Sequence, residues 1–193
     1  PVLFALEVSL AKYWIHLGVE PAYLIGHSLG EYSAACVAEV FSIEEGMRLV
    51  IARSRLMDEM KSVGGMLSVV LSHEKVMQLI ANKNIWVAAI NGPESIVLSG
   101  DLVDLNEMAA DLNGKKISNK FLKVSHAFHS PQMTGMINEY RYYLEDIIMN
   151  LPRYEIISNI TGEPLGDAFL DPHYWLDHIL EPVDFYRGVQ YLD

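Results

Sequence analysis

The segment 26–30 reads Gly-His-Ser-Leu-Gly and places a serine between two glycines. An apolar run at 22–25 precedes it and a helical pattern follows, which predicts a sharp strand-to-helix turn, a nucleophile elbow. The glycines let the backbone bend there without a clashing Cβ atom. The turn exposes the hydroxyl group of Ser28 at a helix N-terminus, where the Leu29 N–H group can stabilise an oxyanion. The segment therefore predicts a serine nucleophile for covalent catalysis.

A serine nucleophile needs a base to take its proton, and the chain has seven histidines. His27 adjoins Ser28 and is expected to point away from it on a tight turn. His126 and His129 bracket a loop that follows a predicted strand and leads to Pro131, a place where functional residues often lie. The remaining histidines lie in patterns typical of helix surfaces or element ends: His16, His73, His173 and His178. The expected base is therefore His126 or His129.

The composition narrows the class of protein. A formal net charge of -11, with only 14 scattered lysines and arginines, argues against nucleic-acid binding, which needs clustered cations. The single cysteine, Cys36, excludes an internal disulfide and a multi-cysteine metal site, so we expect a cytoplasmic protein without a metal. No apolar run approaches the roughly 20 residues of a membrane span, and the start lacks the basic residues of a signal peptide. These features favour a globular enzyme.

Hydrophobic periodicity predicts an α/β protein in which helices flank the elbow. Helices are expected over residues 3–17, directly after the elbow, and over 43–60. The order strand, helix, strand, strand, helix, strand follows, which is typical of a small ferredoxin-like unit. Its expected elements are 66–71, 73–81, 85–91, 95–100, 102–112 and 116–124. Beyond this unit we expect a helix over 132–149, a strand over 154–159 and two short helical stretches.

Four separated segments carry a resemblance to a known family. They read Gly-His-Ser-Leu-Gly-Glu-Tyr at 26–32, Ala-Ile-Asn-Gly-Pro at 89–93 with Val-Leu-Ser-Gly at 97–100, His-Ala-Phe-His-Ser-Pro at 126–131, and Ser-Asn-Ile-Thr-Gly at 158–162. In this order they resemble the acyltransferase domain of modular type I polyketide synthases and fatty acid synthases, the malonyl-CoA:acyl carrier protein transacylase family, across nearly the whole chain. The resemblance implies an α/β-hydrolase-like core with a short parallel sheet at 1–63 and 124–193, and an inserted ferredoxin-like α+β subdomain at 64–123.

The resemblance assigns roles within the loop of two histidines. The family's catalytic histidine falls on the second one, His129, so His126 is the less favoured base. Residues 126–128 fall on substrate-selection positions, where relatives that use methylmalonyl units read Tyr-Ala-Ser. Phe128 is bulky where those relatives carry serine and would crowd an α-methyl branch, a difference worth about 1–3 kcal/mol. Malonyl is therefore the expected unit.

A malonyl group carries a free carboxylate, which calls for a positive, bidentate partner such as arginine. The family's carboxylate-binding arginine maps to Arg53, on the helix expected over 43–60. Arg55 is a rival candidate in the sequence, but a residue two positions further along a helix faces a different side from Arg53. The resemblance also places His27 and Asn91 among the substrate-binding residues.

The resemblance implies ping-pong transfer of a malonyl unit from malonyl-CoA to the phosphopantetheine thiol of an acyl carrier protein, with no bound cofactor. Ser28 is then the nucleophile, His129 the base and Leu29 the oxyanion donor. A backbone carbonyl in the segment 182–185 is expected to orient the histidine, and Asp184 there replaces the glutamine or arginine of many relatives. The implied partners are the carrier protein and flanking synthase domains such as a ketosynthase. We expect a local basic patch to meet the carrier protein, at Lys115, Lys116, Lys120 and Lys123.

The family begins with a Gly-Gln-Gly-x-Gln segment whose glutamine contributes to the oxyanion region, and no such segment precedes Pro1. We therefore interpret the sequence as a piece trimmed at both ends. Because an oxyanion donor is worth about 10²–10³ in rate, this piece is expected to be less active than its parent.

Two alternatives to acyl transfer stay open. A serine hydrolase would need an acidic residue between serine and histidine, for which Asp101 or Asp104 could serve, although both lie at a predicted helix start where Asp is a common cap. A non-catalytic docking fragment would keep Ser28 and His129 without turnover. Acylation by malonyl-CoA but not by simple esters would separate the three functions.

Overall fold

The computed structural model describes residues 1–61 and 64–193 of the chain. Within these residues the strands are β1 (Tyr23–Ile25), β2 (Gly64–Val69), β3 (Ile85–Gly92), β4 (Ser95–Asp101), β5 (Asn119–Phe121) and β6 (Glu155–Ile157). The strands β1 and β6 form a short parallel sheet, with Leu24 opposite Ile156. The others form an antiparallel sheet in the order β3-β4-β2-β5.

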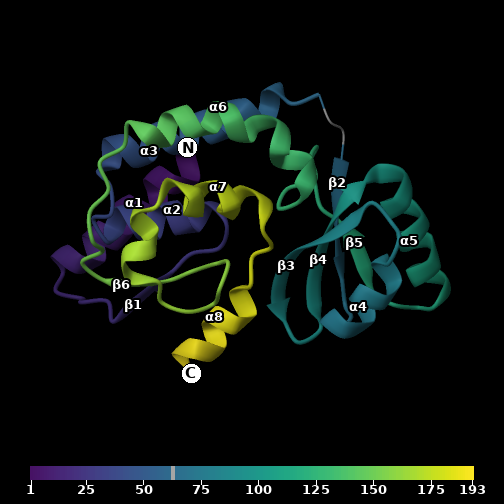
Figure 1. Cartoon of the computed structure of the whole chain (residues 1–193). Helices are drawn as coiled ribbons and strands as arrows, with labels where there is room; N and C mark the ends of the chain where they lie inside the picture. The colour runs from purple at the N-terminus through teal and green to yellow at the C-terminus, as the bar shows by residue number, and fades with distance from the viewer. Residues whose placement is uncertain (62–63) are drawn as a thin grey trace.

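Helices cover both sheets. They are α1 (Val2–His16), α2 (Leu29–Val37), α3 (Ile43–Glu59), α4 (His73–Ile80), α5 (Leu102–Gly114), α6 (Thr134–Glu145), α7 (Pro172–Leu180) and α8 (Phe185–Leu192), with the 3₁₀ turns η1 (Pro131–Met133) and η2 (Gly166–Leu170). Figure 1 shows α1, α2, α3, α6 and α7 gathered with the parallel sheet, and α4 and α5 beside the antiparallel sheet. Among the described residues, no helix combines the length and apolar character needed to cross a membrane.

Helix α2 lies in the middle of the larger core. Its residues 31–37 are all buried, so the helix that follows the elbow is held on every side. The ring of Tyr32 lies 4.7 Å from that of Trp175 in α7, centroid to centroid, and its hydroxyl accepts a hydrogen bond from Tyr140 of α6 at 3.0 Å. Such close packing leaves the start of α2 little freedom to shift.

Successive side chains of β2 point to opposite faces of the antiparallel sheet. Leu67 and Val69 join a smaller core with α4 and α5. Met66 points the other way and packs with Val183, which follows α7. This second face of the sheet therefore looks toward the larger core.

A short extended segment after α7 ties the antiparallel sheet to the larger core. The Val183 N–H group donates to the Ala88 carbonyl at 2.9 Å, and the Val183 carbonyl accepts from the Ile90 N–H group at 2.8 Å. The next N–H group, of Asp184, donates to the carbonyl of Asn159 at 2.7 Å. Because Asn159 follows β6, this segment connects the two sheets.

Most predicted elements are confirmed, and three differ. The strand expected over 116–124 is limited to β5, because Lys116 has a left-handed φ of 57° and its N–H group donates to the Asn113 carbonyl, which closes α5 instead. The long helix expected after the histidine loop starts as η1 and ends at Glu145. Three helical segments follow β6 instead of two.

The predicted fold class, an α/β-hydrolase-like core with a short parallel sheet and an inserted ferredoxin-like α+β unit, is confirmed. The division into 1–63 with 124–193 and 64–123 remains a prediction. Its boundary at residue 63 lies outside the described residues.

Candidate active site

The predicted elbow connects β1 to α2. Ser28 has a positive φ of 51° with ψ −113°, a backbone conformation that residues other than glycine rarely adopt. A Cβ atom at Gly26 would lie 2.1 Å from the carbonyl carbon of Gly30, so only glycine fits there. Leu29 is the first residue of α2, and its N–H group has no partner inside the helix. The turn therefore offers a hydroxyl group next to an unpaired helical N–H group.

Ser28 and His129 form a hydrogen-bonded pair. The Ser28 Oγ atom lies 2.7 Å from His129 Nε2, and His129 Nδ1 lies 2.9 Å from the Glu181 carbonyl oxygen. Because a carbonyl only accepts, Nδ1 carries the ring proton and Nε2 accepts from the serine. Burial, and then the nearby Arg53 and His178, hold the pKa of His129 well below its usual value. The ring is therefore a neutral base at neutral pH.

The carbonyl that orients His129 belongs to Glu181, so the prediction of the segment 182–185 is wrong by one residue. Glu181 caps the end of α7, where the last carbonyls lack partners within the helix. Val183 is instead paired with β3. The carboxylate of Asp184 caps the N-terminus of α8, which gives the acidic side chain a local structural role.

Arg53 lies beside Ser28 in the protein interior. It is 4% exposed, its Nη2 lies 3.5 Å from Ser28 Oγ, and its Nη1 lies 3.4 Å from His178 Nδ1. The guanidinium carbon also lies 5.3 Å from the centre of the Tyr32 ring, a cation–π contact. A buried guanidinium next to a nucleophile is suited to bind a carboxylate with two N–H groups.

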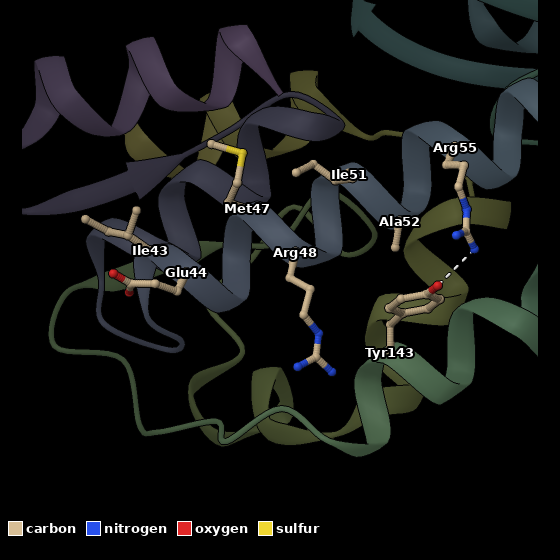
Figure 2. A pocket seen from close by; sticks show the side chains of 8 residues that line it. All are labelled: Ile43, Glu44, Met47, Arg48, Ile51, Ala52, Arg55 and Tyr143. Atoms are coloured by element: carbon tan, nitrogen blue, oxygen red, sulfur yellow. Dashed lines mark hydrogen bonds between the residues drawn. The ribbon is translucent and has the colours of Figure 1, made fainter.

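Arg55 points to another side of α3, as its helical position predicts. Its Nη2 donates to the Tyr143 hydroxyl at 2.9 Å and to Glu139 at 3.0 Å. Figure 2 shows Arg55 and Tyr143 meeting between α3 and α6, at one end of a groove that Ser28 does not line. Arg55 is therefore an exposed counterpart of Arg53 on the same helix.

A cavity of about 480 Å³ lies over the Ser28–His129 pair. It brings together most of the predicted site residues, namely His27, Ser28, Leu29, Arg53, Asn91, Phe128 and His129. Its opposite wall is the second face of the antiparallel sheet, with Met66, Ser68, Ala89 and Val97. A largely apolar wall with a few converging polar groups is typical of a small-molecule site.

The predicted substrate residues differ in their placement. His27 Nε2 and Asn91 Oδ1 lie 2.8 Å apart on the cavity wall, and the His27 ring lies 5.3 Å from that of Phe185. His126 does not line the cavity, because its Nε2 lies 3.3 Å from the Met60 carbonyl and its ring packs 5.9 Å from that of Phe128. His126 therefore lies behind Phe128, which lines the cavity, and contacts that side chain with its ring.

His178 was expected on a helix surface or at an element end, and it lies in the last turn of α7 but is buried, at 1% exposed. Tyr174, Trp175 and His178 share a buried face of α7, and their spacing of three and four residues was the available signal in the sequence. Burial, and then the charge of Arg53, lower the pKa of His178 well below its usual value. A second neutral imidazole therefore supports the arginine.

Glu31 also escaped prediction, although it lies within the motif of the elbow. It is fully buried, and one carboxylate oxygen accepts from the Asn159 N–H group at 2.7 Å while the other contacts the Tyr174 hydroxyl. Burial raises the pKa of Glu31 to about 8. The side chain is therefore mainly uncharged at neutral pH.

Neither aspartate of the hydrolase alternative reaches the histidine. Asp101 caps α5 by accepting from Val103, and Asp104 accepts from the N–H group of Asn84 at 2.8 Å. His129 uses a backbone carbonyl in the place where a triad would have a carboxylate. Across residues 1–61 and 64–193, the His, Cys, Asp and Glu side chains form no group of three or more that could hold a metal ion.

The lysines of the predicted basic patch are all exposed, and they differ in surroundings. Lys115 pairs with Asp111 at 2.6 Å. Lys120 of β5 lies opposite Ser68 of β2, which lines the cavity. Lys120 is therefore the lysine that this register places beside the cavity wall.

The geometry around Ser28 agrees with what sequence comparison finds, since residues 1–192 match the family model described as "Acyl transferase domain". The chain belongs to the acyl transferase domain family. Among its relatives, the spectinabilin polyketide synthase system protein NorB of Streptomyces orinoci is 41% identical over an alignment of length 193 that covers 98% of this chain and 9% of NorB.

Solved acyl transferase domains share the same fold. The domain from the second module of the salinomycin polyketide synthase is 40% identical, with a TM-score of 0.93 over 100% of this chain and 46% of that chain. The domain of SpnD, in complex with 2-(pent-4-yn-1-yl)malonyl, is 32% identical with a TM-score of 0.93, over 98% of this chain and 45% of that chain. This acyl transferase domain thus spans less than half of each of these solved structures.

Proposed function

We propose that this acyl transferase domain moves a malonyl unit from malonyl-CoA to the phosphopantetheine thiol of an acyl carrier protein by a ping-pong mechanism. The observation that carries the proposal is the buried guanidinium of Arg53, 3.5 Å from Ser28 Oγ. A malonyl group on Ser28 has its carboxylate only one methylene from the ester carbonyl, so the carboxylate stays close to this arginine. An acetyl group offers the arginine no charge to bind.

In the first half-reaction His129 Nε2 takes the proton of Ser28 as Oγ attacks the thioester carbonyl. The Leu29 N–H group binds the resulting oxyanion, and the Glu181 carbonyl stabilises the imidazolium through its Nδ1–H group. The intermediate then expels the thiolate of coenzyme A, which takes the proton from Nε2. The products are malonyl-Ser28 and free coenzyme A.

The second half-reaction reverses these steps with a different thiol. His129 takes the proton of the phosphopantetheine thiol, and the thiolate attacks the ester carbonyl of malonyl-Ser28. As the tetrahedral intermediate collapses, Ser28 Oγ leaves and recovers the proton from His129. The enzyme is restored and the carrier protein holds the malonyl thioester.

Two observations support the identity of the acyl unit and the partners. The related SpnD domain is in complex with a 2-substituted malonyl derivative, which supports an acyl unit that carries a free carboxylate, and the bulky Phe128 lines the cavity here and leaves less room for such a branch than a serine would. The related NorB protein and salinomycin domain belong to polyketide synthases, which supports a carrier protein and a ketosynthase as neighbours in a longer polypeptide.

The test is intact-protein mass spectrometry after mixing the chain with malonyl-CoA, methylmalonyl-CoA or acetyl-CoA. We expect a dominant malonyl adduct that disappears in Ser28→Ala and that passes to an added carrier protein. An adduct that persists in Ser28→Ala, or equal labelling by the three thioesters, would contradict the proposal.

A further inference from the structure

One side chain bonds to the backbone on both sides of the elbow. Asn159 follows β6 and is 2% exposed. Its Oδ1 accepts from the Ser28 N–H group at 2.6 Å, and its Nδ2 donates to the Gly26 carbonyl at 2.5 Å. The amide group therefore spans the turn at the residue that carries the nucleophilic hydroxyl.

Glu31 holds Asn159 in place. The Oε2 atom of Glu31 accepts from the Asn159 N–H group at 2.7 Å, and the N–H group of Glu31 donates to the Ser28 carbonyl at 2.9 Å. Glu31 lies in the first turn of α2, so its position relative to Ser28 is set by the helix. Ser28, Glu31 and Asn159 thus form a closed ring of hydrogen bonds.

Asn159 is also hydrogen-bonded to the segment that follows α7, which orients His129. Its carbonyl accepts from the Asp184 N–H group at 2.7 Å. Asp184 follows shortly after Glu181, whose carbonyl lies 2.9 Å from His129 Nδ1. A single residue is therefore linked to the backbone of the nucleophile and to the segment that orients its base.

The backbone of Ser28 needs such support. Its φ of 51° and ψ of −113° form a combination that residues other than glycine rarely adopt, and it persists only where the surroundings impose it. The Ser28 N–H group is occupied by Asn159, which leaves the Leu29 N–H group to face an oxyanion. Because a misplacement of about 1 Å can cost about 10² in rate, a loosened elbow would slow acylation.

We propose that Asn159 is a positioning residue that holds Ser28 in register with His129, and that Glu31 is its anchor. The proposal rests on the proposed role of Ser28 as the nucleophile. Neither Asn159 nor Glu31 lines the cavity, so their loss should slow the reaction without weakening substrate binding.

Asn159→Ala removes both bonds to the elbow. We expect the single-turnover acylation rate at saturating malonyl-CoA to fall about 10²-fold, with the KM for malonyl-CoA within about threefold of the wild type. Glu31→Gln keeps an oxygen for the Asn159 N–H group and resembles the protonated carboxyl, so it should retain a rate within about threefold. Glu31→Ala should lose rate as Asn159→Ala does.

Controls separate positioning from a general loss of stability. Leu144→Ala removes a buried side chain of α6 in the same core, away from the elbow, and should lower the Tm while the acylation rate stays within about twofold below that Tm. If Asn159→Ala lowers the Tm but acylates at the wild-type rate, the positioning role is overturned. Should Asn159→Ala fail to fold, Asn159→Asp keeps the acceptor for Ser28 and loses the donor to Gly26, and it carries the same expectation of a slower rate.

A second reagent keeps this test independent of the substrate. The rate at which a small fluorophosphonate labels Ser28 reports the reactivity of the hydroxyl without any malonyl group. We expect Asn159→Ala to slow this labelling as well, and equal labelling rates would overturn the inference. Fluorophosphonate labelling of the wild type without a malonyl adduct would instead contradict the proposed acyl donor.

Discussion

Arg53→Ala is the most direct perturbation of acyl selection. The guanidinium presents Nη2 near Ser28 and Nη1 near His178 in the protein interior. A bound carboxylate can therefore accept two charge-assisted hydrogen bonds from Arg53. Each is worth about 1.5–3 kcal/mol, which gives about 3–6 kcal/mol in total. This corresponds to a loss of about 10²–10⁴ in the acylation efficiency with malonyl-CoA. Acylation with acetyl-CoA, which lacks the carboxylate, should change far less.

The folded state should survive this substitution. Arg53 lies near the buried Glu31, whose pKa is raised to about 8, so that side chain is mainly protonated at pH 7 and leaves little unpaired charge behind. Arg53→Lys offers a point charge without the planar fork and should fall between the wild type and Arg53→Ala.

The assay is competition between malonyl-CoA and acetyl-CoA, read by intact mass. Arg55→Ala is the matched control, because Arg55 lies on an exposed side of the same helix with Tyr143 and Glu139. It should change the malonyl-to-acetyl ratio by less than about twofold. A ratio that Arg53→Ala leaves unchanged would refute the role of this arginine in binding the carboxylate.

Three further predictions concern the cavity, the elbow and the buried acid. Phe128→Ser should raise the use of methylmalonyl-CoA over malonyl-CoA by about 5–100-fold in a competition assay, and an unchanged ratio would argue against selection by this side chain. Gly26→Ala places a Cβ atom 2.1 Å from the Gly30 carbonyl carbon, so the free energy of unfolding should fall by more than about 3 kcal/mol. A Tm equal to that of the wild type would contradict this clash. The pKa of Glu31 rises from 4.5 to about 8 on folding, so the native state holds a proton that the unfolded state releases, and stability should fall as the pH rises through this window. Glu31→Gln should flatten that dependence in urea unfolding at pH 5, 6.5 and 8, and parallel curves for the two proteins would show that another group is responsible.

The pair of Ser28 and His129 could be predicted because each lies in a short local pattern. The glycines around Ser28 specify the turn, and the loop before Pro131 carries the histidine that the family motif marks. Helical spacing likewise predicted that Arg53 and Arg55 face different sides of their helix, and the family resemblance marked Arg53 as the residue at the site. In each case residues near in sequence determine the direction of the side chain.

The supporting contacts could not be predicted in the same way. Asn159 bonds to Ser28 across 131 positions, and a buried amide has the same local pattern as an exposed one. The choice of Glu181 as the orienting carbonyl depends on where α7 ends and on the pairing of the following residues with β3. The position of His126 outside the cavity depends on the packing of its ring against Phe128.

The alternation of β2 assigns packing and cavity lining to different side chains of one strand. Leu67 and Val69 hold the sheet to its helices, while Met66 and Ser68 on the opposite face shape the cavity. Substitutions at the second pair can therefore change the volume available to an acyl chain while the first pair keeps the fold intact. Met66 and Ser68 are therefore the positions at which a protein engineer can begin to reshape the cavity without touching the contacts of the smaller core.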